Sequence, residues 1–300
     1  MSPTVSVIIP TFNRWPLVGD AIDSVLAQSY GDFEVIVVDD GSTDGTVQQL
    51  SRFGSRLRVL QQPNRGVSAA RNLAARHARG SYLAFLDSDD LWLPEKLALQ
   101  TAFMEQNPAV QICQTEEVWI RNGVRVNPKA KHRKPSGDIF ISSLELCLVS
   151  PSAVMLTRAL FEQVGGFDEN LPVCEDYDLW LRISVDHPVP LIDDALVIKR
   201  GGHADQLSRS MWGMDRYRVS ALQKLLRSGL DGARRAAAIE VLRRKVGVLA
   251  SGARKRGKAS VAAAYEDSLA EFTQEQHVGA RNSRLLSGEG LSPADAGALA

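Results

Sequence analysis

The feature that most constrains this 300-residue chain is an alternation, near its N-terminus, of short and almost wholly apolar runs with helical segments. The runs have the length of strands: Val5–Ile9, Phe33–Val38, Leu57–Leu60 and Ser81–Leu86. Helical spacing covers Leu17–Gln28 and Ser68–Arg79, and Ser42 or Thr43 is expected to cap a helix through Leu50. Strands that are apolar on both faces and alternate with helices indicate a mostly parallel sheet covered by helices on both sides. The sequence therefore predicts an α/β fold.

The later part of the chain has a different pattern. Helical and extended segments are mixed in its middle, where Asn122-Gly123 is expected to form a hairpin turn because both residues tolerate positive φ. A helical pattern rich in Ala, Leu and Arg follows through most of the last third. We therefore predict two domains, residues 1–210 with the sheet and residues 211–300 as a mainly helical accessory region.

The composition excludes several classes of protein. With 44% hydrophobic and 23% charged residues, the chain has enough apolar material for a core and is not predicted to be disordered. No apolar stretch approaches the roughly 20 residues that span a bilayer, and no secretory signal is recognisable, so a cytoplasmic location is expected. The three cysteines are too few and too widely spaced for a disulfide framework or a zinc clip.

Acidic residues follow two of the predicted strands directly. They are Asp39 and Asp40 after the second strand, and Asp87, Asp89 and Asp90 after the fourth. Ligands bind at the carboxyl ends of strands in open α/β sheets, and converging carboxylates are hard oxygen ligands that suit Mg²⁺ or Mn²⁺. The alternative is that both segments are ordinary turn and cap chemistry.

Two arginines lie in the connection that leads into the third predicted helix. Arg65 and Arg71, together with Gly66, stand near a helix N-terminus, where they could meet an anionic group such as a phosphate. Arg71 could equally pair with one of the aspartates at the strand ends. Both interpretations stay open from the residues alone.

Five sequence blocks, taken in order, resemble the family 2 glycosyltransferases. The blocks are VSVIIPTFNR (5–14), FEVIVVDDGSTDGT (33–46), NRGVSAARN (64–72), GSYLAFLDSDDLWLPEKL (80–97) and GGFDENLPVCEDYDLWLR (165–182). The resemblance covers about residues 5–205. It implies the GT-A fold, a nucleotide-diphosphate sugar as donor and inversion at the anomeric carbon.

The resemblance also implies roles for individual residues in the nucleotide site. By position, Asp40 resembles the residue that accepts a hydrogen bond from the base, and Asp87-Ser88-Asp89 resembles the family's Asp-x-Asp motif. Asp87 would face the ribose and the metal region, while Asp89 would bind the Mn²⁺ or Mg²⁺ ion that bridges the phosphates. The nucleoside pocket would be lined by Pro10, Thr11 and Phe12.

The resemblance implies roles for two further residues, Asp176 and His203. Asp176 stands where the family keeps its catalytic base, although acidic residues in the first turn of a helix are also favourable without any catalysis. His203 lies in a late glycine-flanked loop where many GT-A enzymes place a third metal ligand. A surface histidine in that loop is the competing interpretation.

These expectations combine into one reaction. Displacement at an anomeric carbon needs a deprotonated acceptor hydroxyl and a stabilised diphosphate leaving group, which a carboxylate and a metal ion with an arginine supply. The predicted function is an inverting, metal-dependent glycosyltransferase that uses a UDP or dTDP sugar and a hydroxyl of a glycan or lipid-linked saccharide. The alternatives are a sugar nucleotidyltransferase and a non-catalytic nucleotide-binding module.

Charge is unevenly distributed along a chain whose formal net charge is zero. Residues 211–258 carry 13 Lys and Arg against 3 Asp and Glu. A basic helical segment of this kind predicts peripheral contact with the anionic inner face of the cell membrane. Packing on the catalytic domain or dimerisation would use the same residues, and nucleic acid is not an expected partner because no recognition motif accompanies the charge.

Overall fold

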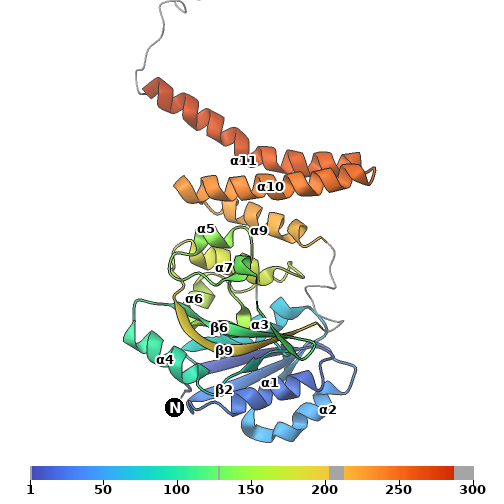
Figure 1. Cartoon of the computed structure of the whole chain (residues 1–300), viewed down its shortest axis with the longest axis vertical. Helices are drawn as coiled ribbons and strands as arrows, with labels where there is room; N and C mark the ends of the chain where they lie inside the picture. Colours follow the sequence, from blue (N-terminus) through green and yellow to red (C-terminus); the bar gives the residue numbers. More distant parts are fainter. Residues whose placement is uncertain (1, 128, 203–212, 287–300) are drawn as a thin grey trace, which may run out of the picture. The chain divides into compact units, whose positions relative to one another are not determined.

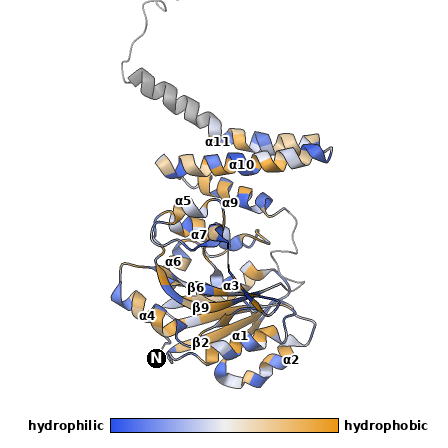
Figure 2. Ribbon diagram, viewed as in Figure 1, coloured by the Kyte–Doolittle hydropathy of each residue, from blue (hydrophilic) through white to orange (hydrophobic). Residues whose placement is uncertain are grey.

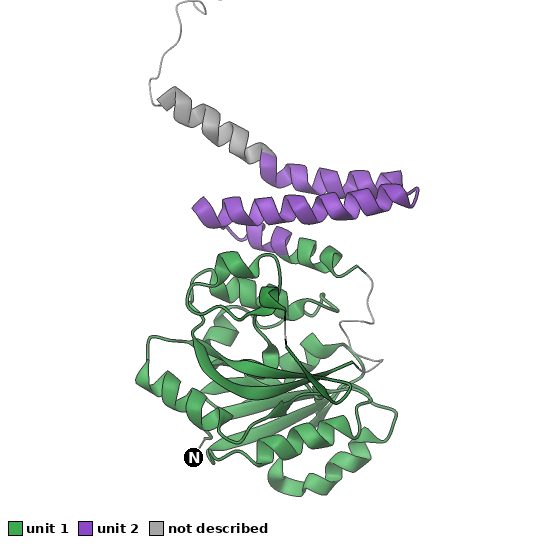
Figure 3. Ribbon diagram, in the orientation of Figure 1, with its two compact units in different colours: residues 1–221 green, residues 222–300 purple. Residues whose placement is uncertain are grey.

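The structure, a computed structural model, describes residues 2–127, 129–202 and 213–286, with side chains to residue 273. The chain forms two compact units, residues 1–221 and 222–300 (Figure 3). The domain boundary predicted at residue 210 falls in the segment 203–212 and so lies outside the described residues.

The first unit is built on a mixed sheet whose first half is parallel, as predicted (Figure 1). Its parallel strands, in spatial order, are β3 (Arg58–Gln61), β2 (Phe33–Asp39), β1 (Val5–Thr11) and β4 (Tyr82–Phe85). Their connections are α1 (Leu17–Leu26), α2 (Thr46–Leu50) with the 3₁₀ segment Ser51–Arg56, and α3 (Val67–His77). Because these strands run the same way, their carboxyl ends form one edge of the sheet.

The second half of the sheet mixes strand directions. The order continues with β8 (Val154–Thr157), β6 (Ile112–Arg121), β9 (Leu191–Gly201) and β5 (Leu91–Trp92), and β7 (Val124–Val126) pairs with β6. β8 is antiparallel to β4 and β6, whereas β6 and β9 are parallel. The hairpin predicted at Asn122-Gly123 joins β6 to β7, with φ of 48° and 77° at its two central residues.

Helices connect and cover these later strands. They are α4 (Lys96–Gln106), α5 (Phe140–Ser143), α6 (Arg158–Gln163) and α7 (Glu175–Ser184), with 3₁₀ turns at Ala130–His132 and Pro151–Ala153. Figure 2 shows the strands of the sheet mainly in the colour of hydrophobic residues, as strands covered on both faces require.

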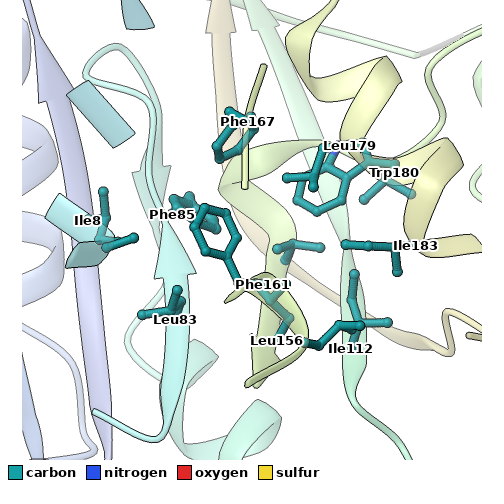
Figure 4. Packing of buried hydrophobic residues seen from close by; sticks show 14 of the residues in the cluster. Ile8, Leu83, Phe85, Ile112, Leu156, Phe161, Phe167, Leu179, Trp180 and Ile183 are labelled. Carbon is teal, nitrogen blue, oxygen red and sulfur yellow. The ribbon is translucent and has the colours of Figure 1, made fainter. Parts of the chain in front are cut away.

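Apolar clusters on the two faces of the sheet explain why its strands are continuously hydrophobic. Successive side chains of a strand point to opposite faces, so Ile8 of β1 packs in one cluster while Val7 and Ile9 pack in the other. The Ile8 cluster includes residues of α3, α6 and α7, and the opposite cluster includes residues of α1 and α4. Figure 4 shows the Ile8 side, where the aromatic rings of Phe85, Phe161 and Phe167 meet.

The expected capping of a helix by Ser42 or Thr43 is wrong. α2 begins later, at Thr46, and the carboxylate of Asp44 accepts hydrogen bonds from the Thr46 backbone N–H (2.9 Å) and hydroxyl. Ser42 Oγ accepts from the backbone N–H of Asn13, and the N–H of Thr43 donates to Asn13 Oδ1. The two residues therefore join the loops after β1 and β2, because a partner distant in sequence satisfies their polar groups.

The second unit contains the end of α9 (Asp215–Arg227), then α10 (Gly232–Lys255) and α11 (Ala259–Leu286). Ile239, Leu242 and Val246 form a buried stripe on α10. The charged surface is partly neutralised by ion pairs inside the unit: Arg227–Glu271, Arg243–Glu240, Arg244–Glu240 and Arg254–Glu266. Among the described helices, none combines the length and apolar character needed to cross a bilayer.

Candidate functional site

The carboxylates predicted to converge lie at the carboxyl edge of the parallel strands. Thr11 ends β1 and pairs in register with Asp39, which ends β2. Asp87, Asp89 and Asp90 follow β4, the neighbour of β1 on its other side. The sheet thus brings together residues that are almost 80 positions apart in sequence, which supports their interpretation as one site rather than as separate turns.

Asp40 organises the loop that enters α3. Its buried carboxylate accepts hydrogen bonds from the backbone N–H groups of Arg65 (2.9 Å) and Gly66 (2.8 Å) and from Gln62 Nε2 (2.6 Å). Gly66 has a φ of 90°, which glycine adopts without strain. A Cβ on Gly41 would approach the Asn64 backbone nitrogen to 2.9 Å, so a side chain there would push the two loops apart.

The nucleoside pocket expected around Pro10, Thr11 and Phe12 contains two unsatisfied polar atoms. Among the described residues, Thr11 Oγ1 and Asp39 Oδ1 are buried without a hydrogen-bond partner. Buried polar atoms without a partner are rare in proteins because their burial costs free energy. A ligand that forms the missing hydrogen bonds would offset that cost. Phe12 is 44% exposed, so its ring is available for stacking, whereas Pro10 is buried inside β1.

Arg71 joins the end of β4 to the first turn of α7. Its Nη2 lies 2.6 Å from Asp87 Oδ1 and its Nη1 lies 2.8 Å from Glu175 Oε1. The guanidinium is buried, with only 3% of the side chain exposed. Of the two interpretations left open by the sequence, pairing with an aspartate at the strand end is the one found, and Glu175 is a second partner that was not anticipated.

The carboxyl group of Glu175 is unusually basic for a glutamate. Burial raises its pKa to about 7, and the neighbouring Asp176 carboxylate adds to the rise, while Arg71 opposes both effects. A buried carboxylate beside a second carboxylate needs a fixed cation to remain in place. Arg71 supplies that cation and so holds the start of α7 against the sheet.

A second contact fixes the segment that leads into α7. Asn72 Nδ2 donates to the carbonyl of Phe167 (2.8 Å), and the N–H of Phe167 donates back to Asn72 Oδ1 (3.0 Å). The Arg71 guanidinium lies 4.9 Å from the centre of the Phe167 ring, which packs edge-on against Phe85 and Trp180 (Figure 4). The motif at 64–72 and the motif at 165–182 are therefore one structural unit.

Asp176, the candidate base, lies in the first turn of α7 with its side chain half-buried. Its Oδ1 accepts a hydrogen bond from the backbone N–H of Tyr177 (2.7 Å). Burial, and then the adjacent Asp176 carboxylate, raise the pKa of the Cys147 thiol, so this cysteine stays protonated beside the base. Asp178 is different because it forms a buried ion pair with Arg182 (2.8 Å), which gives it a structural role.

The carboxylates after β4 differ in their surroundings. Asp89 Oδ2 accepts from Arg14 Nη1 (3.0 Å) and its side chain is 18% exposed. Asp90 is buried and accepts from Ser152 Oγ (2.7 Å) and from the backbone N–H of Arg200 (3.0 Å). Burial raises the pKa of Asp90 well above its usual range; Lys199 opposes this, and Asp89 and Asp87 add to it. Asp90 therefore has a structural role, while Asp87 and Asp89 remain partly exposed.

The donor set of the site fits a hard divalent cation. Mg²⁺ is commonly held by one or two carboxylates and completed by substrate phosphates, which is what Asp87 and Asp89 can offer. Within the described residues, no group of three or more His, Cys, Asp or Glu side chains is placed to hold a metal by itself. His203, the expected third ligand, lies outside the described residues.

Sequence reasoning missed Lys199, a buried cation that interacts with the charge of the candidate base. Its Nζ donates to Ser150 Oγ (3.0 Å) from the end of β9. Burial lowers the pKa of Lys199, but the carboxylates of Glu117, Asp90, Asp87 and Asp176 raise it above its usual value. No local signal marks this residue, because Lys at the end of an extended segment is common and its partners are distant in sequence.

Comparisons with known proteins agree with this architecture. The sequence model of the family described as "Glycosyl transferase family 2" matches residues 6–165. An uncharacterised glycosyltransferase of Rickettsia felis is 36% identical over 200 residues, which cover 64% of this chain and 32% of that protein. The Escherichia coli protein named UDP-Glc:alpha-D-GlcNAc-diphosphoundecaprenol beta-1,3-glucosyltransferase WfgD is 31% identical over 65% of this chain and 76% of its own length.

Solved structures show the same fold. The crystal structure of S. aureus TarS 1-349 in complex with UDP-GlcNAc superposes with a TM-score of 0.70 at 22% identity and covers 91% of this chain and 81% of that one. The predicted GT-A architecture is therefore confirmed. The chain spans about a third or less of the length of three of the curated relatives that it matches.

Proposed function

The chain belongs to glycosyl transferase family 2, and from this premise we propose that it transfers a sugar from a nucleotide-diphosphate donor to an acceptor hydroxyl. The observation that carries the proposal is the convergence of Asp87, Asp89 and the α7 carboxylates on one edge of the sheet, joined by Arg71. A site that combines a phosphate-facing acidic pair with a separate base carboxylate suits direct displacement with inversion.

In the proposed mechanism, Asp176 accepts the proton of the acceptor hydroxyl as that oxygen attacks the anomeric carbon. Asp87 and Asp89 would hold a divalent cation, which supplies charge neutralisation for the diphosphate leaving group. Arg71 keeps Asp87 and Glu175 in fixed positions. The backbone N–H of Tyr177 donates to Asp176 Oδ1 and so helps to fix the orientation of this carboxylate.

The nucleoside is proposed to sit at the ends of β1 and β2. Asp40 keeps its proposed role at the base edge, and Asp39 Oδ1 beside it is a second buried acceptor that an N3–H of uracil or thymine would satisfy. Thr11 Oγ1 provides a hydroxyl for the same group of contacts, and the exposed ring of Phe12 stacks on the base. These features favour UDP or dTDP sugars.

The acceptor is proposed to be a hydroxyl of a glycan or of a lipid-linked saccharide. The printed name of the E. coli relative, which describes glucosyl transfer to a diphosphoundecaprenol-linked sugar, supports this class. A lipid-linked acceptor would place the enzyme at the inner face of the membrane, and we propose that the basic segment 211–258 makes this contact. The turn at Lys255, Arg256 and Lys258 places three exposed basic residues close together in this segment.

Incubation of the full-length protein with a panel of nucleotide sugars and Mn²⁺ tests the activity. Release of nucleoside diphosphate is the expected result, with faster release from UDP or dTDP sugars than from GDP sugars. Release of pyrophosphate with a sugar phosphate and a nucleoside triphosphate would instead indicate a nucleotidyltransferase. Nucleotide binding without any turnover, across a panel of lipid-linked and free acceptors, would indicate a binding module and contradict the proposal.

A further inference from the structure

The β6–β7 hairpin and the loop after it carry positive charge for which the proposed reaction gives no role. Residues 118–137 contain six Lys and Arg and no Asp or Glu. We define the hairpin patch by five of its residues: Trp119, Arg121, Lys129, Lys131 and His132. The three Lys and Arg side chains among them are exposed, while the two rings are half-buried.

The members of the hairpin patch gather around two aromatic rings in tilted contact. The ring centres of Trp119 and His132 are 5.4 Å apart, and the Arg121 guanidinium lies 5.8 Å from the centre of the Trp119 ring. Burial lowers the pKa of His132, and the charges of Lys131, Arg121 and Lys129 lower it further. Across the described residues, Arg121, Lys129 and Lys131 make no ion pair with a carboxylate, so their mutual repulsion is uncompensated within the protein.

A buried ion pair supports the patch from underneath. The indole N–H of Trp119 donates to Glu117 Oε2 (3.1 Å), and Glu117 Oε1 lies 3.2 Å from Lys134 Nζ. Both side chains of this pair are buried. Burial raises the pKa of Glu117, but Lys134 and Lys199 outweigh it and lower the value to about 2, so the carboxylate that holds the indole is ionised at neutral pH. The patch is therefore a fixed platform rather than a set of independent surface chains.

The patch lies beside β9, the strand that carries Lys199. β6 and β9 are parallel, and Trp119 pairs in register with Lys199, so the two side chains point to the same face of the sheet. Lys199 in turn binds Ser150 and interacts with the charge of Asp176. An acceptor that presents its hydroxyl to Asp176 could thus extend over Trp119 towards the basic side chains.

We propose that the hairpin patch binds the phosphate groups of a diphosphate-linked acceptor. Arg and Lys donors beside an aromatic platform match a diphosphate followed by a sugar ring, and the anion supplies the negative charge that the patch lacks. The donor diphosphate has its own proposed site at Asp87, Asp89 and their cation. This inference rests on the proposed glycosyl transfer, whose acceptor class it narrows.

Calorimetric titration of the full-length protein with geranyl diphosphate, in the presence of saturating UDP, tests the patch. Geraniol, which lacks the charged group, serves as the uncharged probe. We expect geranyl diphosphate to bind and geraniol not to bind. The triple variant Arg121→Ala, Lys129→Ala, Lys131→Ala should weaken the affinity by about tenfold or more, because charge-assisted hydrogen bonds are lost.

The matched control is Lys255→Ala, Arg256→Ala, Lys258→Ala, which removes three basic side chains from the second unit and should keep the Kd within about twofold. Both variants should retain the wild-type Tm and the Tm increase caused by UDP. Equal Kd values for the two triple variants would overturn the proposal, as would displacement of the probe by UDP. If the Arg121, Lys129, Lys131 triple variant kept its affinity for geranyl diphosphate but lost binding to phosphatidylglycerol vesicles, the patch would bind lipid headgroups. That result would overturn the proposal too.

The Tm increase with UDP is measured separately and tests the donor site. Its absence, together with no release of nucleoside diphosphate, would contradict the proposed function. A normal Tm increase with UDP, together with an unchanged Kd of the patch variant for geranyl diphosphate, would contradict only the proposed role of the hairpin patch. The two failures are therefore distinguishable.

Discussion

At the scale of single residues, the site depends on carboxylates with similar sequence surroundings and different environments. Asp176 and Asp178 both lie in the first turn of α7, yet only Asp178 is buried in an ion pair. Asp89 and Asp90 are adjacent, yet only Asp89 remains partly exposed. The surroundings of each carboxylate, rather than its place in a motif, separate the groups available to substrate from those that hold the fold.

Asp176→Asn is expected to lower kcat by about a hundredfold or more while leaving the Tm increase with UDP unchanged. The amide keeps the shape of the side chain but cannot take the acceptor proton. Steady-state kinetics and thermal shift measure the two quantities. Asp194→Asn, at an exposed position of β9, is the control and should behave as wild type. Lost UDP binding with a retained kcat would show that the assignment of the base is wrong.

Asp89→Asn is expected to remove the part of UDP binding that depends on Mn²⁺. An amide oxygen is a neutral and weaker ligand for a hard cation than a carboxylate oxygen. Titration calorimetry with UDP, with and without Mn²⁺, should give equal Kd values for the variant and different values for the wild type. The control Asp193→Asn should retain the metal effect. A persisting Mn²⁺ effect in Asp89→Asn would sink the metal assignment.

Lys96→Met is expected to change how stability depends on pH. Lys96 is completely buried, with its Nζ 4.0 Å from the centre of the Trp92 ring, and burial lowers its pKa from 10.5 to about 7. Between pH 7 and 10.5 the unfolded chain therefore holds a proton that the folded chain has released, and stability rises with pH by at most about 1.4 kcal/mol per unit. The gain in folding stability from deprotonation of Lys96 is complete above pH 10.5 and is lost as the pH falls to 7.

Urea unfolding of the Lys96→Met variant at pH 7 and 9.5 measures this effect. Methionine has no proton to lose, so only the wild type gains stability as the pH rises. The free energy of unfolding of the variant minus that of wild type should therefore be greatest at pH 7 and lower by roughly 3 kcal/mol at pH 9.5. Lys258→Met, at an exposed position, should follow the wild-type profile. Parallel profiles for wild type and Lys96→Met would rule out a shifted pKa at this lysine.

At the scale of elements, the position of α7 depends on α3. The strand-to-helix connections of the first half were predictable because their apolar runs and turn residues are local signals. The docking of α7 was not, since Arg71 and Glu175 are 104 positions apart and Asn72 and Phe167 are 95 apart. Both contacts come from adjacent residues of α3, so α3 positions both α7 and the segment that precedes it.

Asn72→Ala is expected to destabilise the fold by about 1–3 kcal/mol, because the polar backbone groups of Phe167 lose their partners. It should also lower kcat more than it raises the Kd for UDP, since the proposed base lies on α7 and the proposed nucleoside pocket does not. Urea unfolding and kinetics provide the measurements. Asn170→Ala, at an exposed position in the same loop as Phe167, should change both quantities little. An equal loss of UDP affinity and kcat would argue against a positioning role.

At the scale of the whole molecule, a sheet unit with the candidate site is followed by a helical unit with a basic surface. The charge excess of residues 211–258 was visible in the sequence, but its distribution was not. Lys245 is buried, and Arg243 and Arg244 both pair with Glu240. The accessible positive charge is therefore smaller than the composition suggests.

Charge reversal at Lys255, Arg256 and Lys258 to Glu is expected to reduce sedimentation of the full-length protein with phosphatidylglycerol vesicles severalfold at low salt. Each basic side chain near an anionic surface contributes about 1 kcal/mol. Neutral phosphatidylcholine vesicles should bind neither protein. Reversal at Arg52, Arg58 and Arg76, which are surface arginines of the sheet unit, is the control and should change little. Equal binding to both vesicle types would refute the membrane contact and favour a packing or dimer role for these helices.

The sequence by itself determined the α/β pattern, the place of the strand ends and the acidic residues gathered there, because periodicity and turn chemistry act over a few residues. Only the tertiary structure decided which carboxylates are neutralised and which remain accessible. Arg71 joins Asp87 to Glu175, and Lys199 approaches Asp176 from a later strand. These pairings depend on burial and on distances between elements far apart in the chain, and local sequence preferences carry no information about either.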